Sequence, residues 1–137
     1  MRILLTGATG LIGSALAARL GAEGHEVIPV SRRPMRFAPR SVVLDMARAT
    51  APEHWLPHLQ GIDAVVNCAG VLQDSPRENT LKVHHGGASA LFRACEQAGV
   101  RRVIHFSAIG VDREQPSAFS ATKIAGDEAL MARDLDW

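Results

Sequence analysis

Three glycines, Gly7, Gly10 and Gly13, punctuate the segment TGATGLIG near the amino end of the chain. The segment follows the apolar run Ile3–Leu5 and precedes a helical pattern of apolar residues. A strand that breaks into glycines and then into a helix points backbone N–H groups and the positive end of the helix dipole at one spot, which suits a phosphate. In such a motif the glycines permit a tight turn, a close backbone approach to a pyrophosphate, and close packing of helix on strand. The spacing therefore predicts a pyrophosphate site; the alternative is a tight turn without a ligand.

The apolar pattern predicts strands that alternate with helices and position this segment. We expect strands at 2–6, 26–31, 41–45, 63–67 and 102–107, and helices at 11–23, 53–59, 78–98 and 119–133, the last capped by Ser117. Short apolar runs without strict alternation are typical of strands covered on both faces, and helices between them imply parallel crossovers. The predicted fold class is α/β, a Rossmann-type doubly wound parallel sheet of about five strands in the order 3-2-1-4-5.

The composition indicates one folded domain and excludes several classes of partner. With 137 residues, 47% of them hydrophobic, the chain can bury a substantial core. A net charge of +1 attracts neither nucleic acid nor an anionic membrane, and six aromatic residues (four Phe, two Trp) argue against base stacking. Cys68 and Cys95 are predicted to be buried free thiols, which favours a cytoplasmic location. No apolar run approaches the length of a membrane-spanning helix.

The carboxyl end of the sequence points to a further strand. The chain stops at Leu135, Asp136 and Trp137, just after the last predicted helix. A sheet that ended with five strands would have to protect both of its edges. We therefore expect the N-terminal part of a longer chain; the alternative is a naturally small domain.

Four segments together resemble the short-chain dehydrogenase/reductase superfamily, in particular its extended and atypical branch of NAD(P)-binding, epimerase/dehydratase-like proteins. TGATGLIG matches the fingerprint TGxxGxxG of that superfamily. The pair Asp45-Met46 resembles the Asp-plus-apolar pair after the third strand, and NCAG at 67–70 resembles the Asn-x-Ala-Gly segment that ends the fourth. ACEQAGVRRV at 94–103 is similar to the stretch that leads into the fifth strand of extended members.

The resemblance implies that residues 1–137 form an NAD(P)-binding Rossmann domain and that a C-terminal substrate-binding part is absent. It places the pyrophosphate on the glycine segment, the adenine ring at Asp45 and Met46, and the cofactor above the end of the fourth strand. The implied cofactor-binding residues are Gly7, Thr9, Gly10, Leu11, Ile12, Gly13, Ser31, Arg32, Arg33, Asp45, Met46, Cys68, Ala69, Gly70, Ser107 and Lys123.

The end of the second predicted strand bears on which nicotinamide cofactor is bound. NAD-preferring members place an acidic residue there for the ribose hydroxyls, and this chain has none. Ser31 is instead followed by Arg32 and Arg33, whose guanidinium groups can hold a 2′-phosphate, and Arg36 and Arg40 come next. We therefore expect NADP, with NAD as the alternative cofactor and a solvated basic loop as the alternative interpretation of the arginines.

The catalytic residues implied by the resemblance are incomplete. Typical active members use a Tyr-x-x-x-Lys pair and a serine: tyrosine exchanges a proton, lysine lowers the tyrosine pKa and binds ribose, and serine holds the substrate. Here Lys123 stands at the lysine position, but Phe119 stands four residues earlier, and the chain contains no tyrosine. Ser107 closes the fifth strand, while the next two positions, where the family's serine falls, are Ala108 and Ile109. We therefore expect a degenerate site at which Lys123 binds ribose, or is simply an exposed helix lysine.

The histidines do not predict a metal site. His84 occupies the place where extended members carry an asparagine in the long helix, and the adjacent His85 lies on another face. His54 and His58 have a spacing that can bind zinc, but Pro57 lies between them and no third ligand is evident.

Two functions stay open at the level of sequence. The first is an NAD(P)-dependent oxidoreductase or epimerase-like enzyme that needs a proton donor other than tyrosine. The second is a non-catalytic dinucleotide-binding module with a structural or redox-sensing role. The expected partners are the dinucleotide and an unidentified small-molecule substrate, without nucleic acid; the sequence does not predict an oligomeric state.

Overall fold

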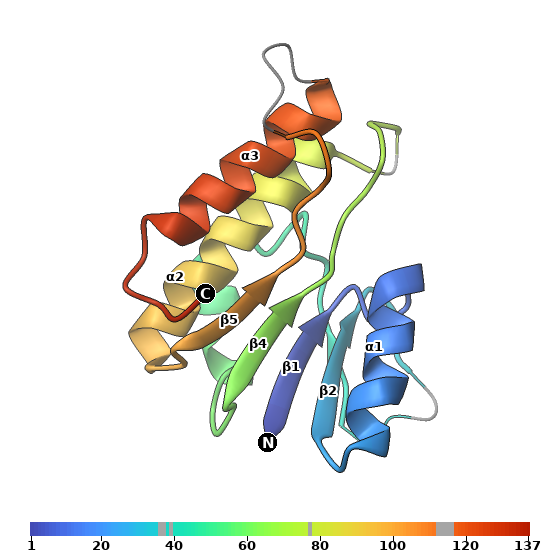
Figure 1. The fold of residues 1–137 in the computed structure, drawn as a ribbon, viewed down its shortest axis with the longest axis vertical. Coiled ribbons are helices and arrows are strands. Elements are labelled where there is room, and N and C mark those ends of the chain that lie inside the picture. Colours follow the sequence, from blue (N-terminus) through green and yellow to red (C-terminus); the bar gives the residue numbers. More distant parts are fainter. Residues whose placement is uncertain (36–37, 39, 77, 112–116) are drawn as a thin grey trace.

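Five parallel strands form one sheet in the computed structural model, which describes residues 1–35, 38, 40–76, 78–111 and 117–137 (Figure 1). The strands are β1 (Arg2–Thr6), β2 (Glu26–Ser31), β3 (Val42–Val43), β4 (Ala64–Asn67) and β5 (Arg102–His105). The α-helices are α1 (Leu11–Ala22), α2 (Ala88–Ala98) and α3 (Ala118–Met131), and shorter helical turns lie between β3 and α2.

The order of the strands is β3-β2-β1-β4-β5, which confirms the predicted doubly wound topology. The central strand β1 pairs in parallel with β2 on one side and with β4 on the other. Because all pairs are parallel, the carboxyl ends of the strands meet at one edge of the sheet. The point where the order reverses lies between β1 and β4, the place where doubly wound sheets bind their ligands.

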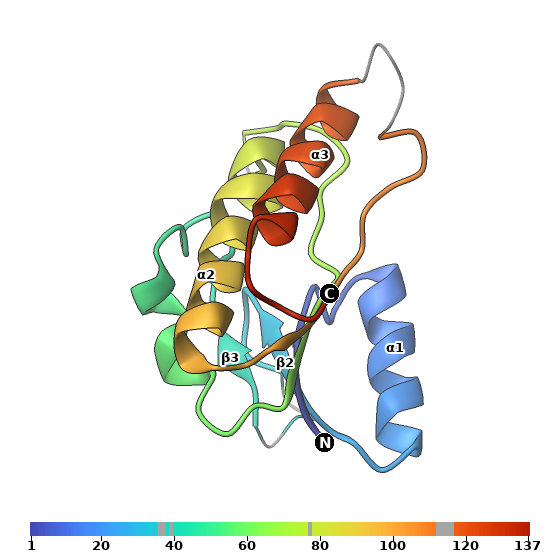
Figure 2. The same cartoon turned by 60° about the vertical axis from the view of Figure 1, so that its left-hand side comes forward.

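Helices cover both faces of the sheet, α1 on one and the pair α2 and α3 on the other (Figures 1 and 2). Alternate side chains of β1 point to opposite faces of the sheet. Leu4 belongs to the larger core cluster, together with Phe92 of α2, and Ile3 and Leu5 belong to the smaller cluster under α1. Burial of a leucine or phenylalanine side chain stabilises the fold by about 1.5–3 kcal/mol, so these clusters hold the helices on the sheet.

The third strand is shorter than expected because polar contacts turn the chain out of the sheet. Only Val42–Val43 pairs with β2, and the Leu44 N–H makes one more hydrogen bond, to the Ser31 carbonyl at 2.9 Å. The Asp45 carboxylate then accepts the Ala47 N–H at 3.0 Å and closes a tight turn. This turn brings Asp45 to the carboxyl edge of the sheet.

The helix expected at 53–59 consists of two 3₁₀ turns, Pro52–His54 and Leu56–His58. Pro57 lacks the N–H that an α-helix would use at that point, which favours the tighter turns. They place Trp55 fully inside the larger core cluster, where its indole N–H donates to the Ala49 carbonyl at 2.9 Å.

The long helix begins later than expected and contains a π-helical segment, Lys82–Gly87, ahead of α2. Its first residue is Thr80, whose N–H and hydroxyl both donate to the Asp74 carboxylate, at 2.6 and 2.9 Å. Glu78 cannot start the helix because its backbone is hydrogen-bonded to Ser75 in a turn. The remaining strands and helices lie within two residues of their predicted bounds.

The carboxyl end of the chain runs beside β5, where Asp136 forms an isolated parallel bridge with Arg102. The Asp136 N–H donates to the Arg101 carbonyl at 2.9 Å, and its own carbonyl accepts the Val103 N–H at 3.1 Å. Arg101 also forms ion pairs with Asp134 and Asp136 at this corner.

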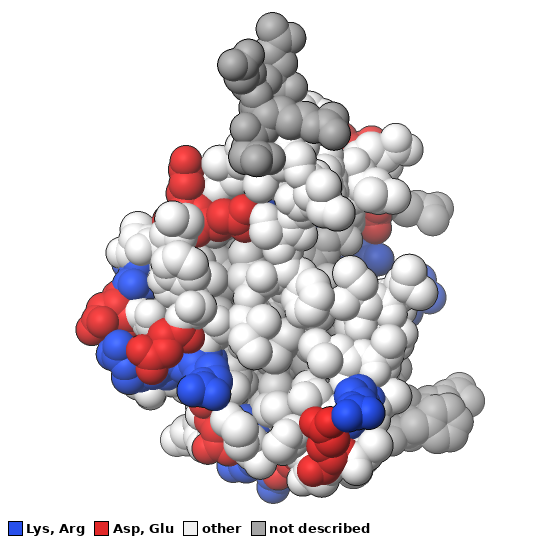
Figure 3. All heavy atoms as spheres, in the orientation of Figure 1, with Lys and Arg blue, Asp and Glu red and all other residues white. Residues whose placement is uncertain are grey.

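On the face in Figure 3, basic and acidic side chains lie next to one another at the periphery and leave the centre uncharged. In the described ranges, no helix has both the length and the hydropathy needed to cross a membrane.

Glycines bring α3 close to the π-helical segment. A Cβ at Gly126 would overlap the carbonyl oxygen of His84, and one at Gly87 would overlap the carbonyl of Met46. The backbone of α3 therefore lies directly on the backbone of the long helix, and this contact positions the side chains of both helices at the carboxyl edge of the sheet.

We predict that Gly126→Ala lowers the free energy of unfolding by about 1–3 kcal/mol, since the added methyl group pushes α3 away from His84. Urea unfolding followed by circular dichroism measures the change. Gly21→Ala is the matched control: nothing lies within 4 Å of a Cβ at Gly21 in α1, so alanine there should be neutral or stabilising by up to about 1 kcal/mol. Equal midpoints for the two variants would contradict the close contact.

Candidate functional site

The glycine segment folds into a tight turn that leaves the start of α1 open. Gly7 has φ +66°, and a Cβ there would lie 2.6 Å from the Cys68 carbonyl carbon, so only glycine fits. The Gly10 N–H donates to the Gly7 carbonyl at 2.9 Å, and Gly13 packs on the same carbonyl. Gly10 is the N-cap of α1 in extended backbone, with no side-chain hydrogen bond to the helix.

Three amides at the start of α1 therefore lack a protein partner of the usual kind. The N–H groups of Leu11, Ile12 and Gly13 belong to the first turn, whose amides have no intrahelical acceptor, and among the described residues the N-cap, a glycine, offers them no side-chain acceptor. The first intrahelical bond runs from the Ser14 N–H to the Gly10 carbonyl at 2.9 Å. Together with the positive end of the helix dipole, these amides form a site for an anion.

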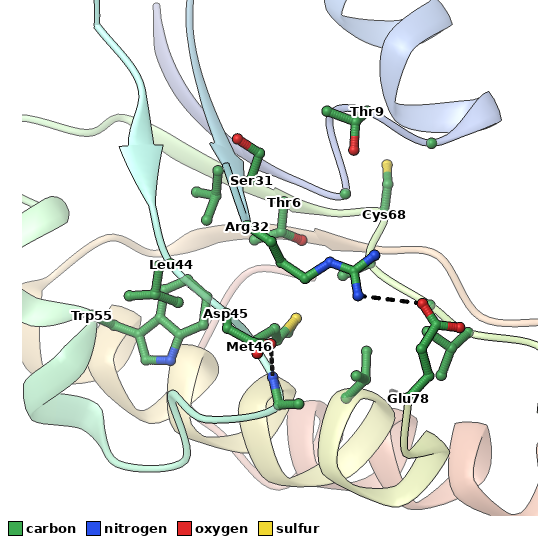
Figure 4. Close-up of a pocket in the computed structure, with 18 residues that line it drawn as sticks. Thr6, Thr9, Ser31, Arg32, Leu44, Asp45, Met46, Trp55, Cys68 and Glu78 are labelled. Atoms are coloured by element: carbon green, nitrogen blue, oxygen red, sulfur yellow. Dashed lines mark hydrogen bonds and ion pairs between the residues drawn. The ribbon is translucent and has the colours of Figure 1, made fainter. Parts of the chain in front are cut away.

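A cavity of about 320 Å³ lies at the carboxyl edge of the sheet, beside this turn (Figure 4). It brings together most of the residues that the sequence predicted to bind the cofactor. Those that line it are Gly7, Thr9, Gly10, Ser31, Arg32, Asp45, Met46, Cys68, Ala69 and Gly70. Its volume falls within the range of about 300–1,000 Å³ found for ligand pockets.

Six predicted residues are not among those that line this cavity. They are Leu11, Ile12, Gly13, Arg33, Ser107 and Lys123. Leu11 and Ile12 have exposed side chains, 90% and 51%, so only their backbone amides can serve the anion site. Gly13 is buried in the turn, as its packing role requires.

Of the predicted arginines, Arg32 reaches the cavity. Its guanidinium lies across the opening and its Nη1 is 3.3 Å from Oε1 of Glu78 (Figure 4). The carbonyl of Arg33 accepts the Ser31 hydroxyl at 2.6 Å, which fixes the end of β2. Arg40 pairs with Glu26 at 3.0 Å, at the opposite end of β2 and away from the cavity. Arg36 lies outside the described residues.

The cavity also contains side chains that sequence reasoning missed: Thr6, Val30, Leu44, Ala47, Trp55, Val71, Glu78 and Val83. Thr6 and Val30 lie at the ends of β1 and β2, and Leu44 directly follows β3, so the strand pattern places these three at this edge. Trp55 and Glu78 come from turns, and no periodicity or motif in the sequence signals their approach to the cavity.

Lys123 lies behind the cavity wall, almost fully buried with 5% of its surface exposed, which excludes the alternative of an exposed helix lysine. Its Nζ donates to the Phe106 carbonyl at 2.7 Å. A Cβ at Gly70, which lines the cavity, would lie 3.7 Å from the same nitrogen, so the ammonium group lies close behind this glycine. The helix that carries Lys123 begins at Ser117, whose hydroxyl accepts the Ser120 N–H at 3.1 Å and confirms the predicted N-cap.

His84 and Phe119 fill the space above Lys123. The ring of His84 meets the ring of Phe119 edge to face, with centroids 5.3 Å apart. Its Nε2 accepts the Val71 N–H at 3.0 Å, so Nδ1 carries the proton and donates to the Thr122 hydroxyl at 2.9 Å. Thr122 in turn donates to the Phe119 carbonyl at 2.9 Å. His84 thus ties the loop after β4 to α3, and both ring nitrogens are occupied.

A second polar chain joins the ends of β1, β4 and β5 to α3. The Thr6 hydroxyl donates to Asn67 Oδ1, and the Asn67 amide nitrogen donates to His105 Nδ1 at 3.0 Å. The other nitrogen of His105 lies 3.2 Å from Asp127 Oδ1, and the Ser107 hydroxyl donates to the second oxygen of the same carboxylate. Ser107 is therefore bound to α3 rather than directed at the cavity.

Burial sets the protonation of this region. It lowers the pKa of His84 and of His105 to about 4, with a further contribution from repulsion by the Lys123 ammonium. Burial also lowers the pKa of Lys123, while the Asp127 carboxylate opposes this shift. The Cys68 thiol has its pKa raised to about 11 by burial and stays protonated. At neutral pH both rings are therefore uncharged.

Across the part of the chain that the structure describes, no three His, Cys, Asp or Glu side chains are grouped to hold a metal ion. Cys68 and Cys95 are free cysteines.

Comparison with known proteins identifies the family to which this site belongs. The model of the NAD dependent epimerase/dehydratase family matches residues 3–132. The chain belongs to this family. Dihydroflavonol 4-reductase of Zea mays is 30% identical over 133 residues, which cover 83% of the chain and 37% of the reductase. The chain spans only 12% to 43% of the length of the curated relatives it matches.

Solved structures of similar proteins share the fold. A short-chain dehydrogenase/reductase superfamily protein of Agrobacterium tumefaciens, with bound NAD, has a TM-score of 0.81 at 24% identity over 98% of this chain and 47% of its own. MoeE5 in complex with UDP-glucuronic acid and NAD has a TM-score of 0.79 at 26% identity over 98% of this chain and 52% of its own. The epimerase/dehydratase fold of this chain thus corresponds to about half of each.

We predict that the stability of this epimerase/dehydratase-family chain falls as the pH drops from about 6.5 to about 4, because His84 has an ordinary pKa of 6.5 and a folded value near 4. In that window the unfolded chain binds a proton that the folded chain excludes. His84→Gln, whose amide oxygen can still accept the Val71 N–H, should reduce the loss of unfolding free energy between pH 7 and pH 5 by about 1–2 kcal/mol.

Denaturant unfolding at both pH values provides the measurement. His85→Gln, one residue along and exposed, is the matched control and should keep the slope of the wild type. If the unfolding free energy of His84→Gln changed with pH as much as that of the wild type, His84 would not be held neutral by the fold.

Proposed function

We propose that residues 1–137 are the dinucleotide-binding domain of an epimerase/dehydratase-family oxidoreductase, with NADP(H) as its cofactor and NAD(H) as the alternative. The observation that carries this proposal is the uncapped start of α1 beside the cavity. The amides of Leu11, Ile12 and Gly13 need an acceptor, and the turn at Gly7 and Gly10 clears the space in front of them. A pyrophosphate satisfies both conditions.

The rest of the cavity suits an adenosine. Arg32 and Ser31 lie where the end of β2 meets the cavity, and Asp45 and Met46 line the neighbouring wall. The guanidinium of Arg32 is the group that favours NADP(H), because it can form paired hydrogen bonds to a 2′-phosphate. NAD is the dinucleotide in the similar structures, and it supports NAD(H) as the alternative.

When bound, a nicotinamide cofactor supplies hydride transfer to or from a substrate carbon. Lys123 is the residue of this chain that would hold the nicotinamide ribose, since its ammonium group lies close behind Gly70 of the cavity wall. Its hydrogen bond to the Phe106 carbonyl fixes that ammonium at the end of β5.

The substrate is a small molecule of unassigned class, and the residues that select it are proposed to lie outside residues 1–137. Two free thiols are consistent with a cytoplasmic location.

A specific observation favours a second function, a non-catalytic dinucleotide-binding module. Phe119 occupies the position four residues before Lys123, and its ring packs on His84 without any hydroxyl to exchange a proton. His84 cannot replace that hydroxyl, because both of its nitrogens are occupied and its pKa is near 4. Catalysis therefore requires a proton donor from another part of the protein or from water.

We predict that Gly10→Asp lowers the affinity for NADPH and for NADH by about tenfold or more, since its carboxylate would take the place of the pyrophosphate. The variant should stay folded: Gly10 has φ −80° and ψ 172°, which any residue adopts, and aspartate is a favoured N-cap. Calorimetric titration measures both affinities. Gly10→Asn, of the same shape without the charge, separates the effect of charge from that of bulk and should lose less affinity than Gly10→Asp; wild-type affinity in both variants would argue against an anion at the start of α1.

We predict that Phe119→Tyr introduces a phenol whose pKa lies below the ordinary value of about 10, because the Lys123 ammonium shares its helix face. The chain has no other tyrosine, so the absorbance of the phenolate reports this group alone. Phe119→Tyr combined with Lys123→Met should return the pKa to its ordinary value or above it. If the pKa of the phenol is the same with and without Lys123, the degenerate site is not a latent Tyr-Lys pair.

A further inference from the structure

An ion pair crosses the cavity at the point where the two cofactors would differ. Nη1 of Arg32, from the end of β2, lies 3.3 Å from Oε1 of Glu78, which comes from the turn before the long helix (Figure 4). Both residues line the cavity. The two side chains approach from opposite walls, and Glu78 thereby engages the guanidinium that would recognise a 2′-phosphate.

Glu78 is held in this place by its backbone. Its N–H donates to the Ser75 carbonyl at 3.2 Å, and its carbonyl accepts the Ser75 N–H at 2.8 Å. Two residues on, Thr80 makes two hydrogen bonds to the Asp74 carboxylate. These hydrogen bonds connect the turn to the start of the long helix and fix the backbone that carries the Glu78 carboxylate opposite Arg32.

Among the described residues, the charged side chains that line the cavity are the guanidinium of Arg32 and the carboxylates of Glu78 and Asp45. Asp45 is engaged by the Ala47 N–H and has Arg48 at 3.9 Å, whereas Glu78 has Arg32 as its cationic partner. Lys123 lies behind Gly70 and is bound to a carbonyl. A 2′-phosphate therefore meets an arginine whose charge Glu78 already compensates.

We propose that Glu78 is a specificity-determining residue that competes with the 2′-phosphate of NADP(H) for Arg32. NAD(H) binds with the ion pair intact, and NADP(H) binds only by displacing the carboxylate. This inference rests on the proposed dinucleotide function and refines it: Arg32 favours NADP(H), and Glu78 reduces that preference. An exposed ion pair contributes little stability. A 2′-phosphate, which accepts charge-assisted hydrogen bonds, can therefore replace the Glu78 carboxylate as the partner of Arg32.

The test is the affinity of the chain for NADPH and for NADH, measured by calorimetric titration. Glu78→Gln should raise the affinity for NADPH at least threefold and change that for NADH by less than twofold. The gain should disappear when Arg32→Gln is added. Glu23→Gln is the matched control, because it removes a carboxylate paired with Arg19 at the far end of α1 and should change neither affinity.

The outcomes separate this inference from the proposed function. If the chain binds both dinucleotides and Glu78→Gln leaves the NADPH affinity unchanged or lowers it, competition by Glu78 is wrong and dinucleotide binding stands. If neither dinucleotide binds the wild type or any variant, both proposals fail. Circular dichroism checks the fold, and Glu78→Asp, with a shorter reach, provides a second variant that should shift the NADPH affinity in the same direction.

Discussion

The uncapped amino end of α1 is the feature on which the rest of this structure depends. Gly7 and Gly13 pack so closely on their neighbours that a side chain at either position would overlap backbone atoms. That packing fixes the helix directly behind β1, with its first amides at the carboxyl edge of the sheet. The same edge collects the ends of β2 and β4, and residues from both line the cavity beside these amides. A fold built around unsatisfied donors is organised for a ligand rather than for stability alone.

The opposite wall of the site is built from buried polar groups. Lys123 is held by a carbonyl, His84 by an amide and a hydroxyl, and His105 by Asn67, while the second ring nitrogen of His105 lies 3.2 Å from Asp127. These bonds link α3 to the end of β5, the long helix to the loop after β4 and to α3, and β4 to β5. The lysine is thus held in place although Phe119 stands where the usual pair has a tyrosine.

The sequence was sufficient for the fold and for the centre of the site, because these depend on local patterns. Apolar runs, the glycine motif and the Ser117 cap each act within a few residues, and the strand order follows once the glycine motif is taken to indicate the dinucleotide-binding pattern. Contacts between residues far apart in the sequence could not be predicted from it. The bond between Arg32 and Glu78 joins residues far apart in the chain, and nothing in either segment indicates the other. The π-helical segment and the attachment of Ser107 to Asp127 likewise depend on tertiary packing.

The most direct test of the account follows the backbone amide resonances of the chain while NADPH or NADH is added. The account predicts saturable shifts at Leu11, Ile12 and Gly13, accompanied by shifts at Ser31 and Arg32. Resonances of Gly21 and Gly24, at the other end of α1, should stay unchanged. Saturable binding that leaves the first turn of α1 unperturbed, or no binding at all, would contradict it.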